Sequence, residues 1–291
     1  MSKLALGTAQ FGLKYGIANE SGQIKKPDAR EIIKFAKEEN INLIDTAMSY
    51  GESEKVIGEI GVADFKIVSK LSNLPQECDN VEFWVEKNVQ HSLSRLGLRS
   101  LYGLLIHNTK DLLGSLGKRL INALNFIKSK GLIKKIGISI YDPSELDHLM
   151  DLTTIDIVQA PLNIIDQRLV TSGWLYKLHK SKVEVHTRSV FLQGLLLMPK
   201  DKIPTKFQRW SKLWNNWSSE LKKNNLSAIE ACLSYSLSLP EINHVLVGVD
   251  NIDQFKDLIK KSQKKKNLPM DWSFMISSDQ KLINPFNWSS L

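Results

Sequence analysis

Eight short apolar runs recur along the chain, and a longer amphipathic stretch separates each from the next. The runs are too short for ordinary helices, and their neighbouring apolar residues are typical of strands that are covered on both faces. Such strands, joined by helices, form a parallel sheet. The expected strands are Lys3–Gly7, Ile41–Ile44, Phe65–Ser69, Tyr102–Ile106, Ile133–Ile138, Ile155–Gln159, Val183–Thr187 and His244–Val247.

The amphipathic stretches have the spacing of helices. Val81, Val85, Val89 and Leu93 follow one another at intervals of four and therefore share one helix face. The expected helices are Asp28–Glu39, Ser53–Ile60, Val81–Leu96, Gly117–Lys130, Asp142–Met150, Asp166–Ser181, Ser227–Ser238 and Ile252–Lys261.

Eight alternating units predict a closed (β/α)8 barrel, the TIM barrel, as a single domain over residues 1–291. An open, doubly wound sheet is the alternative, but it normally carries a GxGxxG turn after an early strand, and this sequence has none. We expect a long loop at about residues 189–225 and a C-terminal tail from about residue 268. Either segment is a candidate to close over the barrel mouth, although a hydrophobic stripe explains Trp210, Trp214 and Trp217 more simply.

Ionisable residues stand at or just past three of the strand ends. These are Asp45, Lys70 and His107, and Tyr50 lies in the loop that follows the second strand. In a barrel, functional groups lie at the C-terminal ends of the strands. An ordinary polar residue at a strand edge explains any one of these positions, but it does not explain all four together.

The residues around these positions resemble the motifs of the aldo-keto reductases. Asp45-Thr46-Ala47-x-x-Tyr50-Gly51-x-Ser53-Glu54 matches the second-strand motif, Ser69-Lys70 the third and Leu104-Leu105-Ile106-His107 the fourth. The resemblance runs from about residue 4 to about residue 258 and is most specific in its first third. It implies an NAD(P)H-dependent enzyme that reduces an aldehyde or ketone to an alcohol.

The four residues suit that chemistry. A carbonyl that accepts hydride develops negative charge on oxygen, and a group must protonate it. A free tyrosine has a pKa of about 10, and a nearby ammonium lowers it. We therefore expect Tyr50 to donate the proton, Lys70 and Asp45 to tune its pKa, and His107 to orient the carbonyl oxygen.

The resemblance also assigns residues to the cofactor. Ser139 and Gln159 would contact the nicotinamide carboxamide, although Ile140 stands where the family often has asparagine. Arg188 stands where many members carry an aromatic residue that stacks on the nicotinamide. A core polar role for Gln159 and an ordinary salt bridge for Arg188 are the alternatives. The implied cofactor-binding residues are Gly7, Thr8, Asp45, Ser139, Gln159, Arg188, Phe191, Gln193, Gly194, Gly248 and Gln254.

The eighth strand end bears on the choice of coenzyme. The family favours NADPH and usually carries cations at two positions here. In this chain those two positions hold Gly248 and Gln254, and Asp250 and Asp253 nearby add negative charge. A 2′-phosphate requires Arg or Lys partners, and Lys256 or Lys260 could substitute for the missing cations. We expect NADPH as cofactor, with NADH also possible.

Composition limits the other possibilities. Cys78 and Cys232 are far apart, so we expect no disulfide, no metal site and a cytoplasmic location. The net charge is +8, but the sharpest basic cluster, residues 260–266, is explained by a helix C-terminus. We expect no nucleic-acid partner, no membrane span, and a monomer or small homo-oligomer. The basic balance and Arg188 favour a polar carbonyl substrate of an anionic or sugar-like kind.

Two other functions remain open from the sequence. One is a redox-sensing regulatory or binding subunit that keeps the reductase fold but has little turnover. The other is a barrel isomerase or aldolase that uses Lys70 to form a Schiff base.

Overall fold

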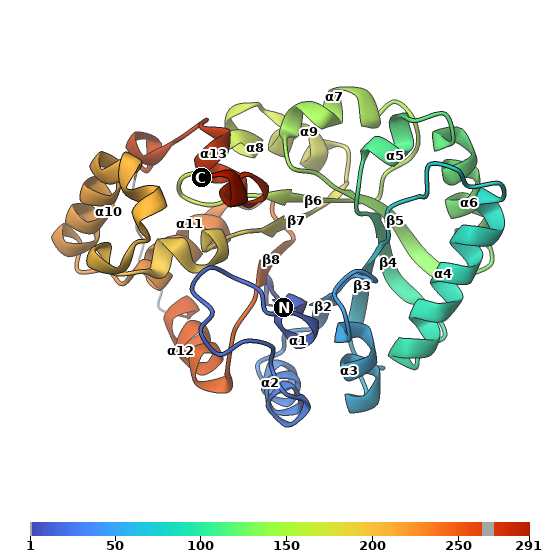
Figure 1. The fold of residues 1–291 in the computed structure, drawn as a ribbon, viewed down its shortest axis with the longest axis horizontal. Helices are drawn as coiled ribbons and strands as arrows, with labels where there is room; N and C mark the ends of the chain where they lie inside the picture. The colour runs from blue at the N-terminus through green and yellow to red at the C-terminus, as the bar shows by residue number, and fades with distance from the viewer. Residues whose placement is uncertain (1, 264–270) are drawn as a thin grey trace.

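The strands close into a barrel (Figure 1). The computed structural model describes residues 2–263 and 271–291. All neighbouring strands are parallel and follow chain order, and β8 pairs with β1. The predicted (β/α)8 barrel is therefore confirmed, and the open sheet is excluded. The strands are β1 (Leu4–Gly7), β2 (Leu43–Asp45), β3 (Lys66–Leu71), β4 (Leu101–Ile106), β5 (Ile133–Ser139), β6 (Ile157–Pro161), β7 (Glu184–Arg188) and β8 (His244–Val247).

Helices surround the barrel (Figure 1). Buried apolar side chains fill the space between the strands and this outer layer. The helices are α1 (Ala9–Gly12), α2 (Lys26–Glu38), α3 (Ser53–Ile60), α4 (Val81–Leu96), α5 (Lys110–Leu113), α6 (Gly117–Ser129), α7 (Leu146–Leu149), α8 (Arg168–Thr171), α9 (Trp174–Lys180), α10 (Ser211–Lys223), α11 (Ala228–Ser238), α12 (Ile252–Ser262) and α13 (Gln280–Ile283).

A second core fills the inside of the barrel. It contains Ala5, Leu43, Val68, Leu105, Ile157 and Leu246. Side chains alternate between the two faces of a strand, so the residue two positions after each of these also points inward. That position holds Asp45 in β2, Lys70 in β3 and Gln159 in β6. The alternation of side chains along each strand thus places these polar groups above an apolar core.

Several expected elements differ from the observed ones. The helix expected over residues 142–150 is a 3-10 turn, Pro143–Glu145, followed by the short α7. The helix expected over residues 166–181 is two helices, α8 and α9, because Gly173 between them adopts a φ of 78° that ends helical geometry. The sixth strand runs from Ile157 to Pro161, two residues later than expected.

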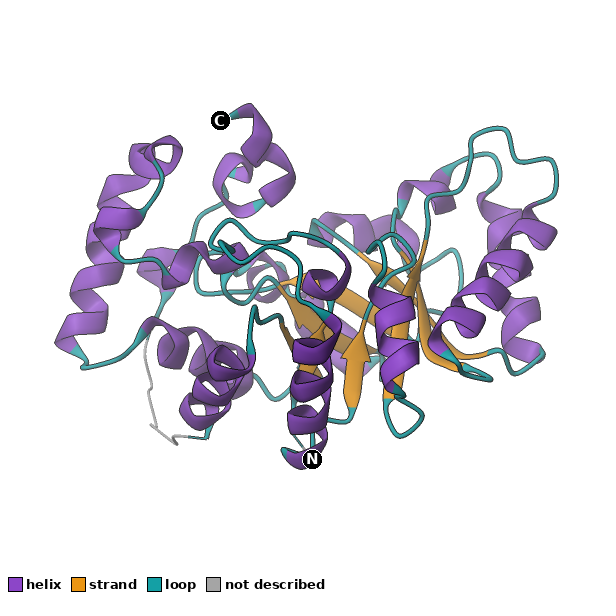
Figure 2. Cartoon of the chain, turned by 60° about the horizontal axis from the view of Figure 1, so that its bottom comes forward, coloured by secondary structure: helices purple, strands orange, loops and turns teal. Residues whose placement is uncertain are grey.

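The long loop after β7 contains α10. The indole N–H of Trp214 donates to the Phe207 carbonyl (2.8 Å), and that of Trp217 donates to the Leu196 carbonyl (3.1 Å). The ring of Trp217 also lies 5.5 Å from that of Trp272 in the C-terminal segment. These contacts support the hydrophobic-stripe interpretation. Figure 2 shows α10 and the C-terminal helices beyond one side of the barrel.

No helix in the described ranges is long and apolar enough to cross a membrane. Both cysteines are free, and Cys232 is buried whereas Cys78 is partly exposed. Residues 264–266 of the basic cluster, and the start of the tail at 268–270, lie outside the described residues.

Candidate active site

A cavity of about 410 Å³ opens at the C-terminal ends of the strands. The ends of β1, β2, β6, β7 and β8 contribute to its wall, together with the first connection of the chain and the start of α12. Most of the site residues expected from the sequence line this cavity. They are Gly7, Thr8, Asp45, Tyr50, Gln159, Arg188, Phe191, Gln193, Gly194, Gly248 and Gln254.

Lys70 and Asp45 form a buried ion pair beneath the cavity. Lys70 Nζ lies 2.6 Å from Asp45 Oδ2 and also donates to the Thr46 carbonyl at 3.0 Å. Gln159 Nε2 donates to the other oxygen of Asp45 at 2.7 Å. Lys70 is only 1% exposed and does not line the cavity. It is therefore placed to act on Tyr50 rather than directly on a ligand.

Tyr50 connects this pair to His107. Lys70 Nζ lies 5.0 Å from the centre of the Tyr50 ring, and the rings of Tyr50 and His107 are 6.0 Å apart. Ser49 Oγ lies 3.3 Å from His107 Nδ1. The structure therefore brings the four residues from β2, β3 and β4 into one cluster, with Tyr50 at the cavity wall.

The pKa shifts in this cluster differ from our expectation. Burial, reinforced by the charge of Asp45, raises the pKa of Tyr50 above its usual value, although Arg188 opposes the shift. Burial, with Lys70 and Arg188, lowers the pKa of His107 to about 4. Burial also lowers the pKa of Lys70, although Asp45 opposes that shift. The expected net lowering of the Tyr50 pKa is therefore not observed, because burial and Asp45 outweigh the opposing charge of Arg188. Tyr50 and His107 are both neutral near pH 7, and each can donate a hydrogen bond.

Arg188 lies at the end of β7 without a carboxylate partner among the described residues. Its Nη2 donates to the Ile140 carbonyl at 2.9 Å, and its guanidinium lies 4.5 Å from the centre of the Tyr141 ring. The salt-bridge alternative for Arg188 is therefore not observed. Its charge faces a cavity that Tyr50 and Tyr15 also line.

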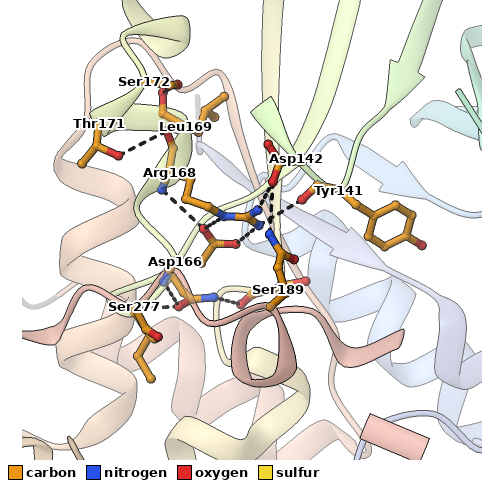
Figure 3. A network of polar contacts seen from close by, with 12 residues as sticks. Tyr141, Asp142, Asp166, Arg168, Leu169, Thr171, Ser172, Ser189 and Ser277 are labelled. Atoms are coloured by element: carbon orange, nitrogen blue, oxygen red, sulfur yellow. Dashed lines mark hydrogen bonds and ion pairs between the residues drawn. The ribbon is translucent and has the colours of Figure 1, made fainter. Parts of the chain in front are cut away.

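A polar network supports this wall of the site (Figure 3). Arg168 Nε donates to Asp166 at 2.8 Å, and its guanidinium also bonds to Asp142 and to the Tyr141 carbonyl. Asn163 Nδ2 donates to the Ser189 carbonyl at 3.0 Å. The network joins the connections after β5, β6 and β7, so it fixes the segments that carry Tyr141 and Arg188.

The loop after β7 has an unusual backbone. Gln193 and Gly194 adopt φ values of 54° and 90°, and the Gln193 carbonyl accepts a hydrogen bond from Ile17 N at 3.1 Å. A side chain at Gly194 would meet Ala18 Cβ at 2.6 Å. This loop therefore packs closely against the connection between β1 and α2 at the edge of the cavity.

One buried polar atom in the cavity wall supports a nicotinamide cofactor. Gln159 Oε1 is buried without a hydrogen-bond partner in the described part of the chain, and such an acceptor suits the N–H₂ of a carboxamide. The residues therefore fit the group that the resemblance implies. Ser139 is level with Gln159 in the register of β5 and β6, but it does not line the cavity.

The sequence did not single out several residues that line the cavity. Gln10 lies three residues after the end of the first strand, and Asp257 lies one turn beyond Gln254 on α12. Proximity to a strand end is the sequence signal that could have identified such residues. Tyr15 and Asn19 lie in the first connection of the chain.

Comparisons with known proteins agree with this geometry. The sequence model of the aldo/keto reductase family matches residues 3–271. L-galactose dehydrogenase of Arabidopsis thaliana is 26% identical over 93% of this chain and 87% of its own. NADH-specific methylglyoxal reductase of Escherichia coli is 25% identical over 83% and 80%. An aldo-keto reductase structure from Bacillus halodurans has a TM-score of 0.74 and 21% identity, covering 94% of this chain and 90% of its own.

Proposed function

The chain belongs to the aldo/keto reductase family, and from this premise we propose that it reduces a small aldehyde or ketone to an alcohol with NAD(P)H. The observation that carries the proposal is the cluster of Asp45, Lys70, Tyr50 and His107 at a cavity that also holds the unpartnered Gln159 oxygen. A bound nicotinamide would supply the hydride, because no side chain can.

In this mechanism Tyr50 gives its phenolic proton to the carbonyl oxygen while the carbon accepts hydride. Lys70 stabilises the tyrosinate that remains, and Asp45 fixes the position of Lys70 through their 2.6 Å contact. Neutral His107 donates a hydrogen bond that orients the carbonyl oxygen. Gln159 and Arg188 would hold the nicotinamide end of the cofactor, and the Phe191–Gly194 loop would hold its phosphates.

Arg188 supports a substrate that carries a polar or anionic group, such as a sugar-like carbonyl compound. Its guanidinium faces the cavity beside Tyr50 and has no carboxylate partner in the described ranges. A guanidinium binds carboxylate or phosphate oxygens in a planar, paired geometry. The Schiff-base alternative receives no such support, because Lys70 is buried behind Asp45 and away from the cavity.

Replacement of the proton donor tests the proposal. We expect Tyr50→Phe to lower kcat for a panel of aldehydes and sugars by roughly 10²–10⁴-fold, which is the usual contribution of a positioned acid. Cofactor binding, followed by quenching of tryptophan fluorescence, should stay within about twofold of the parent, because the substitution leaves the ring in place.

Turnover at the parent rate in Tyr50→Phe would exclude this role for Tyr50. A parent protein that binds cofactor but turns over none of the panel, and that instead captures a partner protein, would favour a regulatory subunit.

A further inference from the structure

The end of the cavity that lies between β8 and α12 is acidic. Asp250 and Asp257 line it, and Gln10 faces Gly248 from α1. Among the described residues, Arg188 is the one cation that lines the cavity, and it lies at the end of β7. Figure 1 shows β8 leading into α12 on one side of the barrel.

Of these two carboxylates, Asp250 is the one without a compensating charge. Asp257 pairs with Lys261 at 2.6 Å. Asp250 has no ion pair in the described part of the chain, although the side chains of Gln254 and Gln10 form hydrogen bonds to it. In addition, the Asp250 N–H donates to Gln254 Oε1 at 3.0 Å. The amides orient this carboxylate but leave its charge unopposed.

Among the residues that the structure describes, no Lys or Arg lines this end of the cavity, and neither Lys256 nor Lys260 reaches its wall. A side chain at Gly248 would approach Gln10 Nε2 to 2.7 Å, so a lysine there would require Gln10 to move. The N-terminus of α12 is already occupied, since Asn251 accepts from Gln254 N at 2.9 Å and Asp253 lies in the first turn. The Asn251 side chain therefore occupies one of the N–H groups that could hold an anion, and the Asp253 carboxylate opposes an anion near this helix end.

We infer that this end of the cavity selects NADH over NADPH, with the Asp250 carboxylate accepting a hydrogen bond from the adenosine ribose 2′-hydroxyl. The inference rests on the proposed function, which requires the nicotinamide to lie at Tyr50, so that the rest of an extended dinucleotide occupies the cavity toward β8. A 2′-phosphate in that position carries close to two negative charges and would lie beside an uncompensated carboxylate.

The test measures coenzyme affinity directly. Quenching of tryptophan fluorescence by NADH and by NADPH gives both dissociation constants without any substrate. We expect the parent protein to bind NADH at least about tenfold more tightly than NADPH.

Three variants show which residues cause the coenzyme preference. Asp250→Asn should reduce the preference about tenfold, chiefly by tightening NADPH binding, because it removes one charge facing the phosphate. Gln254→Arg should tighten NADPH binding by about tenfold or more, because it restores a cation at the expected position. Asp253→Asn is the matched control: it removes the same charge three residues further along the chain, in the first turn of α12, but Asp253 is exposed and does not line the cavity. That variant should keep the parent preference to within about twofold.

The outcomes are distinguishable. NADPH binding as tight as NADH binding in the parent would overturn the inference and leave the proposed function intact. Equal effects of Asp250→Asn and Asp253→Asn would also overturn it, because general electrostatics would then explain the preference. Failure of both coenzymes to bind would overturn the proposed function together with the inference.

Discussion

Lys70 is the buried cation beneath the candidate site. Lys70 is 1% exposed and contacts Asp45, the Thr46 carbonyl and the face of Tyr50. A buried ion pair is costly to break, because removing one partner leaves the other charge without compensation. The same contacts therefore bear on both stability and proton transfer.

Lys70→Met should destabilise the protein by about 3–5 kcal/mol, because it removes the charged partner of the buried Asp45 side chain. Urea unfolding followed by circular dichroism measures this loss. The double variant Asp45→Asn, Lys70→Met should recover most of the stability but none of the turnover. A Lys70→Met variant as stable as the parent would contradict the role of the ion pair.

At the scale of elements, two loops form one edge of the cavity. Gly194 adopts a φ of 90°, and an added Cβ would lie 2.6 Å from Ala18 Cβ. Its neighbour Gln193 accepts a hydrogen bond from Ile17 N. The connection after β1 and the loop after β7 are therefore held in contact by a position that only glycine fits without strain.

Gly194→Ala should weaken cofactor binding about tenfold or more, because the loop after β7 must move to accommodate the methyl group. Gly22→Ala is a matched control: its φ is 79°, but nothing lies within 4 Å of an added Cβ. Both substitutions strain the backbone at a positive φ, but only Gly194→Ala also brings a methyl group too close to Ala18. Equal coenzyme titrations for the two variants would show that the contact with Ala18 does not matter.

For the whole molecule, the base of the barrel holds an unusual group of ionisable residues. Tyr102 Oη donates to Glu184 at 2.7 Å, and Lys135 Nζ lies 2.6 Å from the same oxygen. The rings of His186 and His244 are 4.9 Å apart. Burial, together with His186, lowers the pKa of His244 to about 4; Lys66 and Lys135 add to this shift, and Glu184 opposes it.

We expect stability to fall as the pH is lowered from about 6.5 to about 4, because the unfolded chain then binds protons that native His244 and His107 resist. Above about pH 7 neither the folded nor the unfolded chain binds these protons, so this loss of stability does not occur. Each histidine accounts for up to roughly 3 kcal/mol, which urea unfolding at pH 7 and pH 5 would detect.

His244→Asn should reduce this dependence on pH. A substitution of the exposed His91 on α4 should keep the dependence of the parent. An unchanged slope in His244→Asn would show that this histidine does not contribute.

Local patterns in the sequence were enough to predict the barrel and the clustering of Asp45, Lys70, Tyr50 and His107. Asp45, Lys70 and His107 follow strand ends, and the period of two turns the strand residues Asp45 and Lys70 inward, so short-range rules decide where they lie. The break at Gly173 and the later start of β6 were missed, because boundaries depend on packing against other elements.

Only the tertiary structure decided how distant segments combine. Arg188 lies against Tyr141, and Gln10 approaches Gly248, through contacts between residues far apart in the chain. It also decided the direction of the Tyr50 pKa, because desolvation depends on everything that surrounds the ring. The sequence by itself determined which residues stand at the strand ends, because strand period and position are local properties. The burial of those residues and the charges around them depend on segments from the whole fold, so only the tertiary structure decides them.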